Sequence, residues 1–294
     1  MRESESTKIV VLGSTGMAGH VVCTRLSQRP ELQVFNVARR PWNDDTIILD
    51  ARDGTALERV IRDISPDIII NCMGVLIKGS EKDPTSAIRV NSLLPHLLVD
   101  LCDRYGGRLI HLSTDCVFSG KNGPYRPMDQ RDGDSIYDRT KALGEVVNER
   151  DLTVRTSITG PELEPSGQGL FNWFMKQRGP VRGFSKAMWS GVMTTQLAQF
   201  MEDICLGYET SKGLVHYSVP GGISKYDLLA LFKSEFDTRA DIERFDSELV
   251  DKRLLPSESL RHLPPDYPTQ IRNMRSWMVK HRNFYAHYDW KGSM

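Results

Sequence analysis

The sequence has no excess of charge of either sign and no long apolar run. Its 294 residues carry 38 lysines and arginines against 38 aspartates and glutamates. A neutral chain has no general electrostatic attraction to nucleic acid or to an anionic membrane. No apolar stretch approaches the roughly 20 residues of a membrane-spanning helix, and no apolar signal-peptide core follows the polar start MRESEST. We therefore expect no nucleic-acid partner and no membrane association.

Cysteine is also scarce. The five cysteines form no CxxC pair, and their odd number leaves one without a partner. This usage is typical of reduced thiols in a cytoplasmic protein rather than of a disulfide framework or a metal centre. We expect no metal site. The cysteines are Cys23, Cys72, Cys102, Cys116 and Cys205.

Strand-like and helix-like segments alternate over the first 160 residues. Short runs rich in Val, Ile and Leu, typical of strands inside a parallel sheet, are separated by longer segments with helical spacing. This alternation predicts an α/β fold, a doubly wound parallel sheet of the Rossmann type. The expected strands are 8–12, 33–38, 46–49, 66–70, 107–112 and 152–157, and the expected helices are 20–29, 54–64, 84–105 and 137–149.

The pattern changes after residue 160. A Pro/Gly/Glu loop is followed by fewer strands and by helices near 170–176, 194–206 and after Ser224. We expect one domain over 1–160 and a smaller region over 161–294, partly interleaved with it. The tail 272–290 mixes basic and aromatic residues, and at zero net charge it favours an amphipathic terminal helix over a nucleic-acid patch.

A glycine-rich turn follows the first strand directly and leads into a helix. This context is the one that a dinucleotide-binding turn requires, although a glycine pattern alone can be a simple turn. Gly13 permits the tight turn, Gly16 lets backbone approach a pyrophosphate, and Gly19 lets the helix pack close to the strand. The helix N-terminus offers free N–H groups to phosphates. We assign cofactor binding to Gly13, Ser14, Thr15, Gly16 and Met17.

The second strand ends in Arg39 and Arg40, where nicotinamide-binding folds meet the adenosine ribose. An acidic residue there selects a free 2′-hydroxyl, whereas arginines suit a 2′-phosphate. We therefore expect NADPH, with NADH as the alternative if the arginines are a solvated surface pair. On this basis 1–160 is the expected NADP-binding domain and 161–294 the expected substrate-binding region. Asp50 and Ala51, after the third strand, are expected near the adenine, and Asp53 is a candidate helix cap.

The fourth strand ends in Asn71, Cys72 and Met73, where small residues and backbone are expected to lie against the cofactor. Asn91, inside the expected helix 84–105, is either a hydrogen-bonding residue of the core or part of a proton relay.

The stretch from His111 to Glu145 carries the candidate chemistry. Tyr137 and Lys141 are four residues apart, so they share one face of a helix. An ammonium beside a phenol favours the phenolate and lowers the tyrosine pKa from about 10, which makes a usable proton donor to a carbonyl oxygen. Thr114 emerges at the carboxyl end of strand 107–112, where ligands bind in such sheets, and could hold the same oxygen.

These motifs together resemble those of the extended short-chain dehydrogenase/reductases. The segments GSTGMAG, STDCVF, YDRTK, SGKNGPYRPMD and GGISKYDLL are most similar to the dTDP-4-dehydrorhamnose reductase branch. The resemblance implies NADPH-dependent reduction of the 4-keto group of a 4-keto-6-deoxy nucleotide sugar, in deoxysugar and polysaccharide biosynthesis in the cytoplasm. It implies that Tyr137 is the general acid, that Lys141 lowers its pKa and binds the nicotinamide ribose, and that Thr114 holds the keto oxygen beside Asp115. It also implies a homodimer through the tyrosine-bearing helix.

Two positions depart from the branch. Asp138 stands where relatives often have Gly, and Cys116 stands where they usually have Tyr. Cys116 resembles the cysteine of epimerase–reductases, which exchange protons through a cysteine and a histidine, so an epimerase or epimerase–reductase is an alternative. No histidine lies between His111 and His216, which favours a small apolar role for Cys116. Dehydratases need a Glu at this position, so dehydration is disfavoured.

A non-catalytic NADP-binding regulatory subunit is a second alternative, because the same fold serves as a partner of methionine adenosyltransferase. The intact set of Thr114, Tyr137 and Lys141 argues against it. The second half of the sequence contains no motif that identifies the nucleotide base of the substrate. Asn172, Arg182 and Trp189 are candidates for sugar or diphosphate contacts, and their structural alternatives are a cap, a surface charge and a core anchor.

Overall fold

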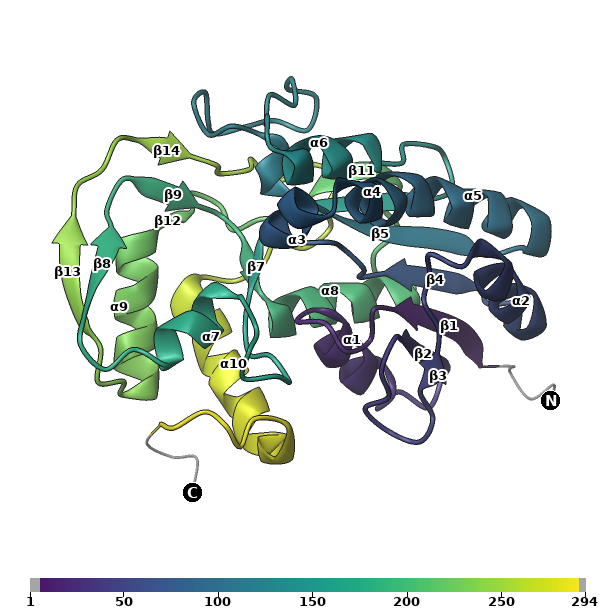
Figure 1. Cartoon of the computed structure of the whole chain (residues 1–294), viewed down its shortest axis with the longest axis horizontal. Coiled ribbons are helices and arrows are strands. Elements are labelled where there is room, and N and C mark those ends of the chain that lie inside the picture. The colour runs from purple at the N-terminus through teal and green to yellow at the C-terminus, as the bar shows by residue number, and fades with distance from the viewer. Residues whose placement is uncertain (1–5, 291–294) are drawn as a thin grey trace.

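The computed structural model describes residues 6–290, and its centre is a seven-stranded parallel sheet (Figure 1). The strands run in the order β11-β6-β5-β4-β1-β2-β3. This order reverses direction between β1 and β4, so the carboxyl ends of these strands border the crevice where doubly wound folds bind ligands. The strands are β1 (Thr7–Leu12), β2 (Leu32–Ala38), β3 (Ile47–Ile48), β4 (Ile68–Asn71), β5 (Arg108–Thr114), β6 (Leu152–Thr156) and β11 (Gly213–His216). The predicted fold class is confirmed.

Helices cover both faces of this sheet because its strands are apolar on both sides. Successive side chains point to opposite faces, so Ile9 and Val11 pack into one core cluster and Val10 and Leu12 into the other. The first cluster lies against α1 (Gly19–Leu26) and α8 (Thr194–Cys205), and the second against α2 (Gly54–Ile64) and α5 (Leu94–Tyr105). No helix among residues 6–290 is both long enough and apolar enough to cross a membrane.

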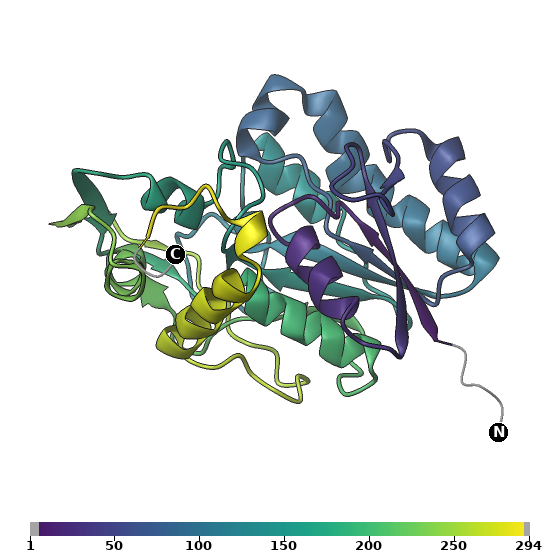
Figure 2. The same ribbon diagram turned by 90° about the horizontal axis from the view of Figure 1, so that it is seen from below.

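The part after β6 builds a second layer beside the sheet and also returns to it. Strand β11 pairs with β6, and α8 packs on α1, so the chain crosses back after residue 160. Figure 2 shows α8 and α10 side by side on the same face as α1. The remaining helices are α3 (Ile77–Lys82), α4 (Pro84–Ala87), α6 (Ile136–Leu143), α7 (Leu170–Met175), α9 (Lys225–Phe236) and α10 (Tyr267–Lys280).

Short strands hold this second part together. Strand β9 (Ala187–Trp189) lies between β12 (Ile223–Ser224) and β14 (Val250–Asp251). Strand β8 (Pro180–Phe184) pairs with β13 (Asp241–Phe245), and β7 (Ile158–Thr159) pairs with β10 (Val192–Met193). The β12–β9 pairing places Ile223 opposite Trp189, which brings the start of α9 next to this tryptophan.

The predicted C-terminal end of helix 137–149 is wrong, because α6 ends at Leu143. A Cβ at Gly144 would lie 1.9 Å from the Asn91 carbonyl oxygen, so the chain here passes directly against the neighbouring helix. The next residues follow β6 instead, where Thr153 Oγ1 accepts from the Val146 N–H at 3.1 Å. The predicted helix 84–105 is present, but residues 88–93 form a π-helical segment between α4 and α5.

The predicted terminal helix 272–290 begins and ends earlier than expected. The carboxylate of Asp266 caps α10 by accepting from the Thr269 N–H at 2.8 Å, and the helix ends at Lys280. Aromatic side chains of the tail are buried in the core rather than set on a surface stripe, namely Trp277, Tyr285, Tyr288 and Trp290.

Candidate active site

The glycine turn after β1 has the close contacts that its sequence predicts. Gly13 has a φ of +80°, a conformation that L-residues with side chains rarely adopt. A Cβ at Gly19 would lie 2.1 Å from the Gly13 carbonyl oxygen. Helix α1 begins at Gly19 and therefore sits directly behind the turn, with its free N–H groups at the same sheet edge.

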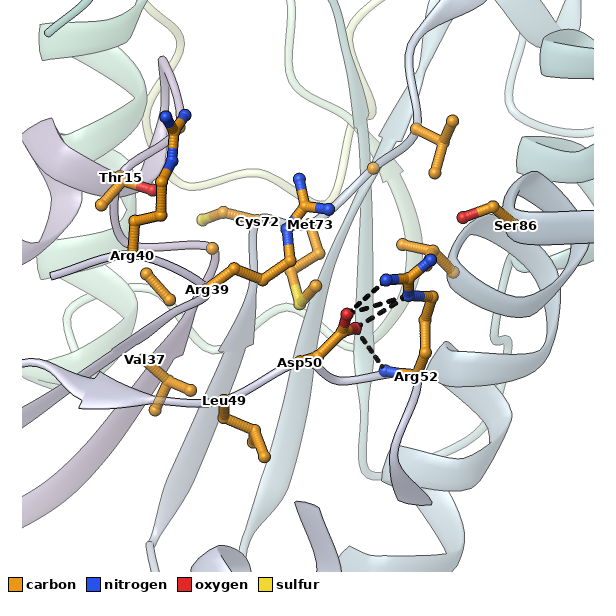
Figure 3. A pocket seen from close by; sticks show the side chains of 16 residues that line it. Thr15, Val37, Arg39, Arg40, Leu49, Asp50, Arg52, Cys72, Met73 and Ser86 are labelled. Carbon is orange, nitrogen blue, oxygen red and sulfur yellow. Dashed lines mark hydrogen bonds and ion pairs between the residues drawn. The ribbon is translucent and has the colours of Figure 1, made fainter. Parts of the chain in front are cut away.

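A cavity of about 190 Å³ opens in front of this turn (Figure 3). The carboxyl ends of β1, β2 and β4 and the segment after β3 form its wall. The cavity wall contains eight residues predicted to bind a cofactor: Gly13, Thr15, Gly16, Arg39, Arg40, Asp50, Cys72 and Met73. It also contains residues that the sequence did not single out, among them Arg52 and Ser86.

Three arginines surround the part of the cavity next to β2 and β3. Arg39 and Arg40 extend from the end of β2, and both side chains are exposed (Figure 3). Across the cavity, Arg52 donates through Nε to both carboxylate oxygens of Asp50 at 3.0 Å. This contact lowers the pKa of Asp50 to about 2. The spacing Asp-x-Arg after the third strand is the signal that could have identified Arg52.

Five predicted cofactor residues do not line this cavity: Ser14, Met17, Ala51, Asn71 and Lys141. Ser14 is fully buried, and its hydroxyl makes no hydrogen bond with the described residues. Asn71 shapes the turn after β4, where its Oδ1 accepts from the Met73 N–H at 3.1 Å. Its side chain therefore orients Met73, which does line the cavity.

Asn91 proves to be a structural hydrogen-bonding residue. Its Oδ1 accepts from the Val75 N–H at 2.8 Å, and its Nδ2 donates to the Val75 carbonyl at 3.0 Å. The same Nδ2 lies 3.1 Å from Thr140 Oγ1 on α6. Asn91 thus fixes the segment after β4 against the tyrosine-bearing helix.

A capping box positions Tyr137 in the first turn of α6. Ser135 Oγ accepts from the Asp138 N–H at 3.1 Å, while Asp138 Oδ2 accepts from the Ser135 N–H at 3.3 Å. Helix capping therefore explains the aspartate at position 138, one of the two positions that differ from the reductase branch. Burial raises the pKa of Tyr137 above its ordinary value, and a hydrogen bond with the Thr114 side chain opposes that rise. The two hydroxyls meet at the carboxyl end of β5.

The ammonium of Lys141 is held on β5 in this structure. Its ammonium donates to the Leu112 carbonyl at 2.7 Å and lies 3.4 Å from His111 Nε2. Burial lowers the pKa of Lys141 to about 8, a shift that Glu145 opposes. The expected lowering of the Tyr137 pKa is absent, because burial dominates at the phenol and the ammonium is held on β5 instead.

Asp115 and Cys116 follow Thr114 in a short 3₁₀ turn. Burial raises the pKa of Asp115, and Lys225 and Lys252 oppose that rise. Burial, reinforced by the Asp115 charge, raises the pKa of the Cys116 thiol to about 12, so the thiol stays protonated at neutral pH. Neither lysine was predicted, because both come from segments far along the chain.

The histidines that flank Cys116 in the sequence, His111 and His216, contact other groups. Nδ1 of His111 lies 3.2 Å from the Asn71 side-chain amide. Arg155 Nη1 lies 2.8 Å from His216 Nε2, and the His216 Nδ1 lies 3.1 Å from the Leu255 carbonyl oxygen. Both imidazoles are therefore hydrogen-bonded within the fold to groups other than the cysteine.

The three candidates for substrate contacts lie in different environments. Trp189 is buried, and the ammonium of Lys225 lies 4.5 Å from its ring centre. Asn172 is buried and donates to the Pro165 and Gly167 carbonyls at 3.1 and 2.7 Å, so it orders the loop before α7. Arg182 is exposed on β8, with its guanidinium 4.9 Å from the ring centre of Phe245.

Known proteins resemble this chain over much of its length. Residues 7–259 match the family described as RmlD substrate binding domain. A dTDP-4-dehydrorhamnose reductase of Mycobacterium tuberculosis is 34% identical over 146 residues, 48% of this chain and 45% of that protein. This match spans less than half the length of either protein. The spore coat polysaccharide biosynthesis protein SpsK of Bacillus subtilis is 30% identical over 237 residues, 78% of this chain and 79% of that protein.

Solved structures share the fold. A crystal structure of a dTDP-4-dehydrorhamnose reductase from Bacillus anthracis, in complex with NADP, superimposes with a TM-score of 0.79 at 17% identity. The similarity covers 92% of this chain and 99% of that one. At this level of identity the similarity establishes the arrangement of helices and strands.

Proposed function

The chain belongs to the RmlD substrate binding domain family, and on that basis we propose that it is an NADPH-dependent reductase of a 4-keto-6-deoxy nucleotide sugar. The reaction would serve deoxysugar or polysaccharide synthesis in the cytoplasm. The observation that carries the proposal is the meeting of the Thr114 and Tyr137 hydroxyls at the sheet edge that also bears the glycine turn. Relatives named dTDP-4-dehydrorhamnose reductase support the same substrate class.

The residues around the cavity fit a dinucleotide phosphate. A Cβ at Gly13 would lie 3.0 Å from Met73 Cγ and 3.2 Å from the Cys72 carbonyl carbon, so the glycine lets the turn lie directly against the segment after β4 in the cavity wall. Arg39 and Arg40 carry exposed guanidinium groups at the end of β2, which suits a 2′-phosphate. These residues would hold the adenosine half, and when bound the cofactor supplies a hydride.

The proposed proton chemistry belongs to Thr114 and Tyr137. The Thr114 hydroxyl would orient the keto oxygen, and Tyr137 would donate its phenolic proton to that oxygen as the alkoxide develops. Because burial raises the pKa of Tyr137, the phenol keeps its proton until charge develops on the substrate. The ammonium of Lys141 is four residues away on α6 and would hold the nicotinamide ribose after leaving the Leu112 carbonyl.

A homodimer stays a prediction. Leu143 at the end of α6 and Val147 just after it are each 68% exposed, which supports an apolar contact at the predicted helix pair. Light scattering of the purified chain, with Leu143→Glu as the disrupting variant, measures the oligomeric state.

The function is tested by mixing the protein with NADPH and dTDP-4-dehydrorhamnose and following nicotinamide absorbance. We expect Tyr137→Phe to lower kcat by about 10²–10⁴-fold while the Kd for NADPH stays unchanged. The matched control is Tyr208→Phe, since Tyr208 is 62% exposed. A parent protein that binds NADPH without oxidising it in the presence of any 4-keto nucleotide sugar would instead indicate the regulatory subunit.

A further inference from the structure

Lys225 places a charged group, on a partly buried side chain, beside the residues that follow Thr114. It is the first residue of α9, and its ammonium lies 4.5 Å from the centre of the Trp189 ring. The ammonium interacts electrostatically with Asp115 and Cys116, the two residues that follow Thr114. Among residues 6–290 it makes no hydrogen bond and no ion pair. Burial lowers the pKa of Lys225 to about 8.

This position is unfavourable for a lysine with a purely structural role. A buried ammonium without a hydrogen-bonded partner costs stability. The first turn of a helix carries the positive end of the helix dipole, which further disfavours a cation. The contact with the Trp189 ring offsets part of this cost. A methionine would fill the same space without the charge, so the retained ammonium points to a ligand.

The carboxylate of Asp115 is the charged group that acts most strongly on the Lys225 ammonium. Asp115 Oδ1 is 3.2 Å from Thr114 Oγ1, the hydroxyl assigned to the keto oxygen. Asp115 is buried, and Lys225 lowers its pKa against the effect of burial. Lys252 also acts on Asp115, with a partly exposed side chain. An acceptor and a donor therefore lie next to the proposed position of the carbonyl without being paired directly to each other.

We propose that Lys225 and Asp115 together bind the hydroxyl on the sugar carbon next to the carbonyl carbon, a role that rests on the proposed reductase function. Lys225 donates to the hydroxyl oxygen, and Asp115 accepts the hydroxyl proton. In a 4-keto-6-deoxy sugar this carbon is C3, since C5 carries the ring oxygen and the methyl group. Lys225 is thus a substrate-binding residue that selects a C3 hydroxyl.

The pair of opposite charges also defines what the site rejects. A carboxylate or phosphate at C3 would be repelled by Asp115, and an ammonium at C3 would be repelled by Lys225. A C3-deoxy sugar would remove one hydrogen bond from each of the two charged groups, which costs more than the loss of one hydrogen bond between neutral groups. The substrate class is therefore a nucleotide 4-keto sugar with a neutral hydroxyl at C3.

The test measures KM and kcat of the full chain with NADPH and two probes, dTDP-4-dehydrorhamnose and its 3-deoxy analogue. We expect Lys225→Met to raise KM for the hydroxylated probe by about ten- to a hundredfold, with a smaller change in kcat. On the 3-deoxy analogue, parent and variant should agree within about twofold. Lys225→Arg, which keeps the charge, should recover part of the loss.

The matched control is Lys233→Met on the same helix, where the lysine side chain is 43% exposed and faces Asp241 at 3.9 Å. It should leave KM unchanged for both probes. The Tm of Lys225→Met should equal or exceed that of the parent, because a buried charge is removed. A lower Tm, an unchanged KM, or an equal loss on both probes would each overturn the role of Lys225. A parent that binds NADPH but reduces neither probe overturns the proposed function for this sugar, and with it this role.

Discussion

Nε2 of His20 lies 2.9 Å from the hydroxyl of Tyr285, which joins the first helix to the end of the chain. On the other side of the ring, Nδ1 lies 2.8 Å from the Gly16 carbonyl oxygen. Because a carbonyl can only accept, Nδ1 carries the proton, and Nε2 accepts from the Tyr285 hydroxyl. The Tyr285 oxygen in turn accepts from Trp277 Nε1 at 3.0 Å. These hydrogen bonds form a buried relay that connects the Gly16 carbonyl of the glycine turn to α10 and to Tyr285 after it.

Tyr285→Phe should lower the free energy of unfolding by about 2–4 kcal/mol, because it leaves His20 Nε2 and Trp277 Nε1 buried without partners. Urea denaturation followed by tryptophan fluorescence measures the loss. Tyr105→Phe is the control, since Tyr105 bonds Glu58 at a partly exposed position, and it should cost less than about 1 kcal/mol. Equal losses in the two variants would show that the relay adds nothing.

The stability of the protein should fall as the pH falls from about 6.5 towards 4. Burial lowers the pKa of His20 to about 4, so between these values the unfolded chain binds a proton that the folded chain does not. The folded state therefore loses up to about 3 kcal/mol from this residue over that window. Unfolding free energies at pH 7 and pH 4.5 measure it, and His20→Gln should show a smaller difference between the two pH values. The same difference in parent and variant would contradict the assignment.

Gly19→Ala should destabilise the fold by about 2–3 kcal/mol and weaken NADPH binding. The new Cβ would lie 2.1 Å from the Gly13 carbonyl oxygen, so either α1 or the glycine turn must move. Gly54→Ala is the matched control, because a Cβ at the start of α2 meets nothing within 4 Å. The control should gain about 0.5 kcal/mol. Thermal unfolding with and without NADPH separates the two effects.

Arg39→Ala and Arg40→Ala should each weaken NADPH binding by about tenfold or more and leave NADH binding nearly unchanged. The reason is that a 2′-phosphate is held by charge-assisted hydrogen bonds, which NADH cannot form. Fluorescence titration with both cofactors gives the ratio of Kd values. Arg62→Ala is the control, since Arg62 is paired with Asp63 on the exposed face of α2. Equal losses for NADPH and NADH would place the arginines outside the phosphate site.

The sheet and the glycine turn could be predicted from sequence because their signals are local. Each strand is a short apolar run, and Gly13, Gly16 and Gly19 lie at the first strand–helix junction. The positions of Thr114 at a strand end and of Tyr137 at a helix start were also predictable, since each depends on a local signal, while their roles stay predictions. The capping box of Ser135 and Asp138 shows the same principle, because its two residues are three apart.

The features that sequence reasoning missed depend on contacts between distant segments. The end of α6 depends on how closely Gly144 approaches Asn91, and no local signal encodes that approach. The position of Lys141 depends on Leu112, and that of Lys225 depends on Trp189 across a separate small sheet. Sequence periodicity and residue spacing describe one helix or strand at a time. These side chains, in contrast, are positioned by the packing of two such elements against each other.

Cys116→Ser should retain kcat within about threefold, and this outcome separates ketone reduction from epimerisation. Burial raises the pKa of the thiol to about 12, so Cys116 is not a base at neutral pH. Serine has nearly the same size and also stays protonated, so a residue that only fills space should tolerate the change. In deuterated water the parent enzyme should give a product without deuterium at C3 or C5.

Incubation of the substrate in deuterated water without protein is the control for spontaneous exchange beside the keto group. Deuterium above that background, together with a loss of more than about a hundredfold in Cys116→Ser, would assign proton abstraction to the cysteine and make the protein an epimerase–reductase. The structure argues for the opposite result, since the His216 imidazole is held by Arg155 and the Leu255 carbonyl and is not available as the second acid or base.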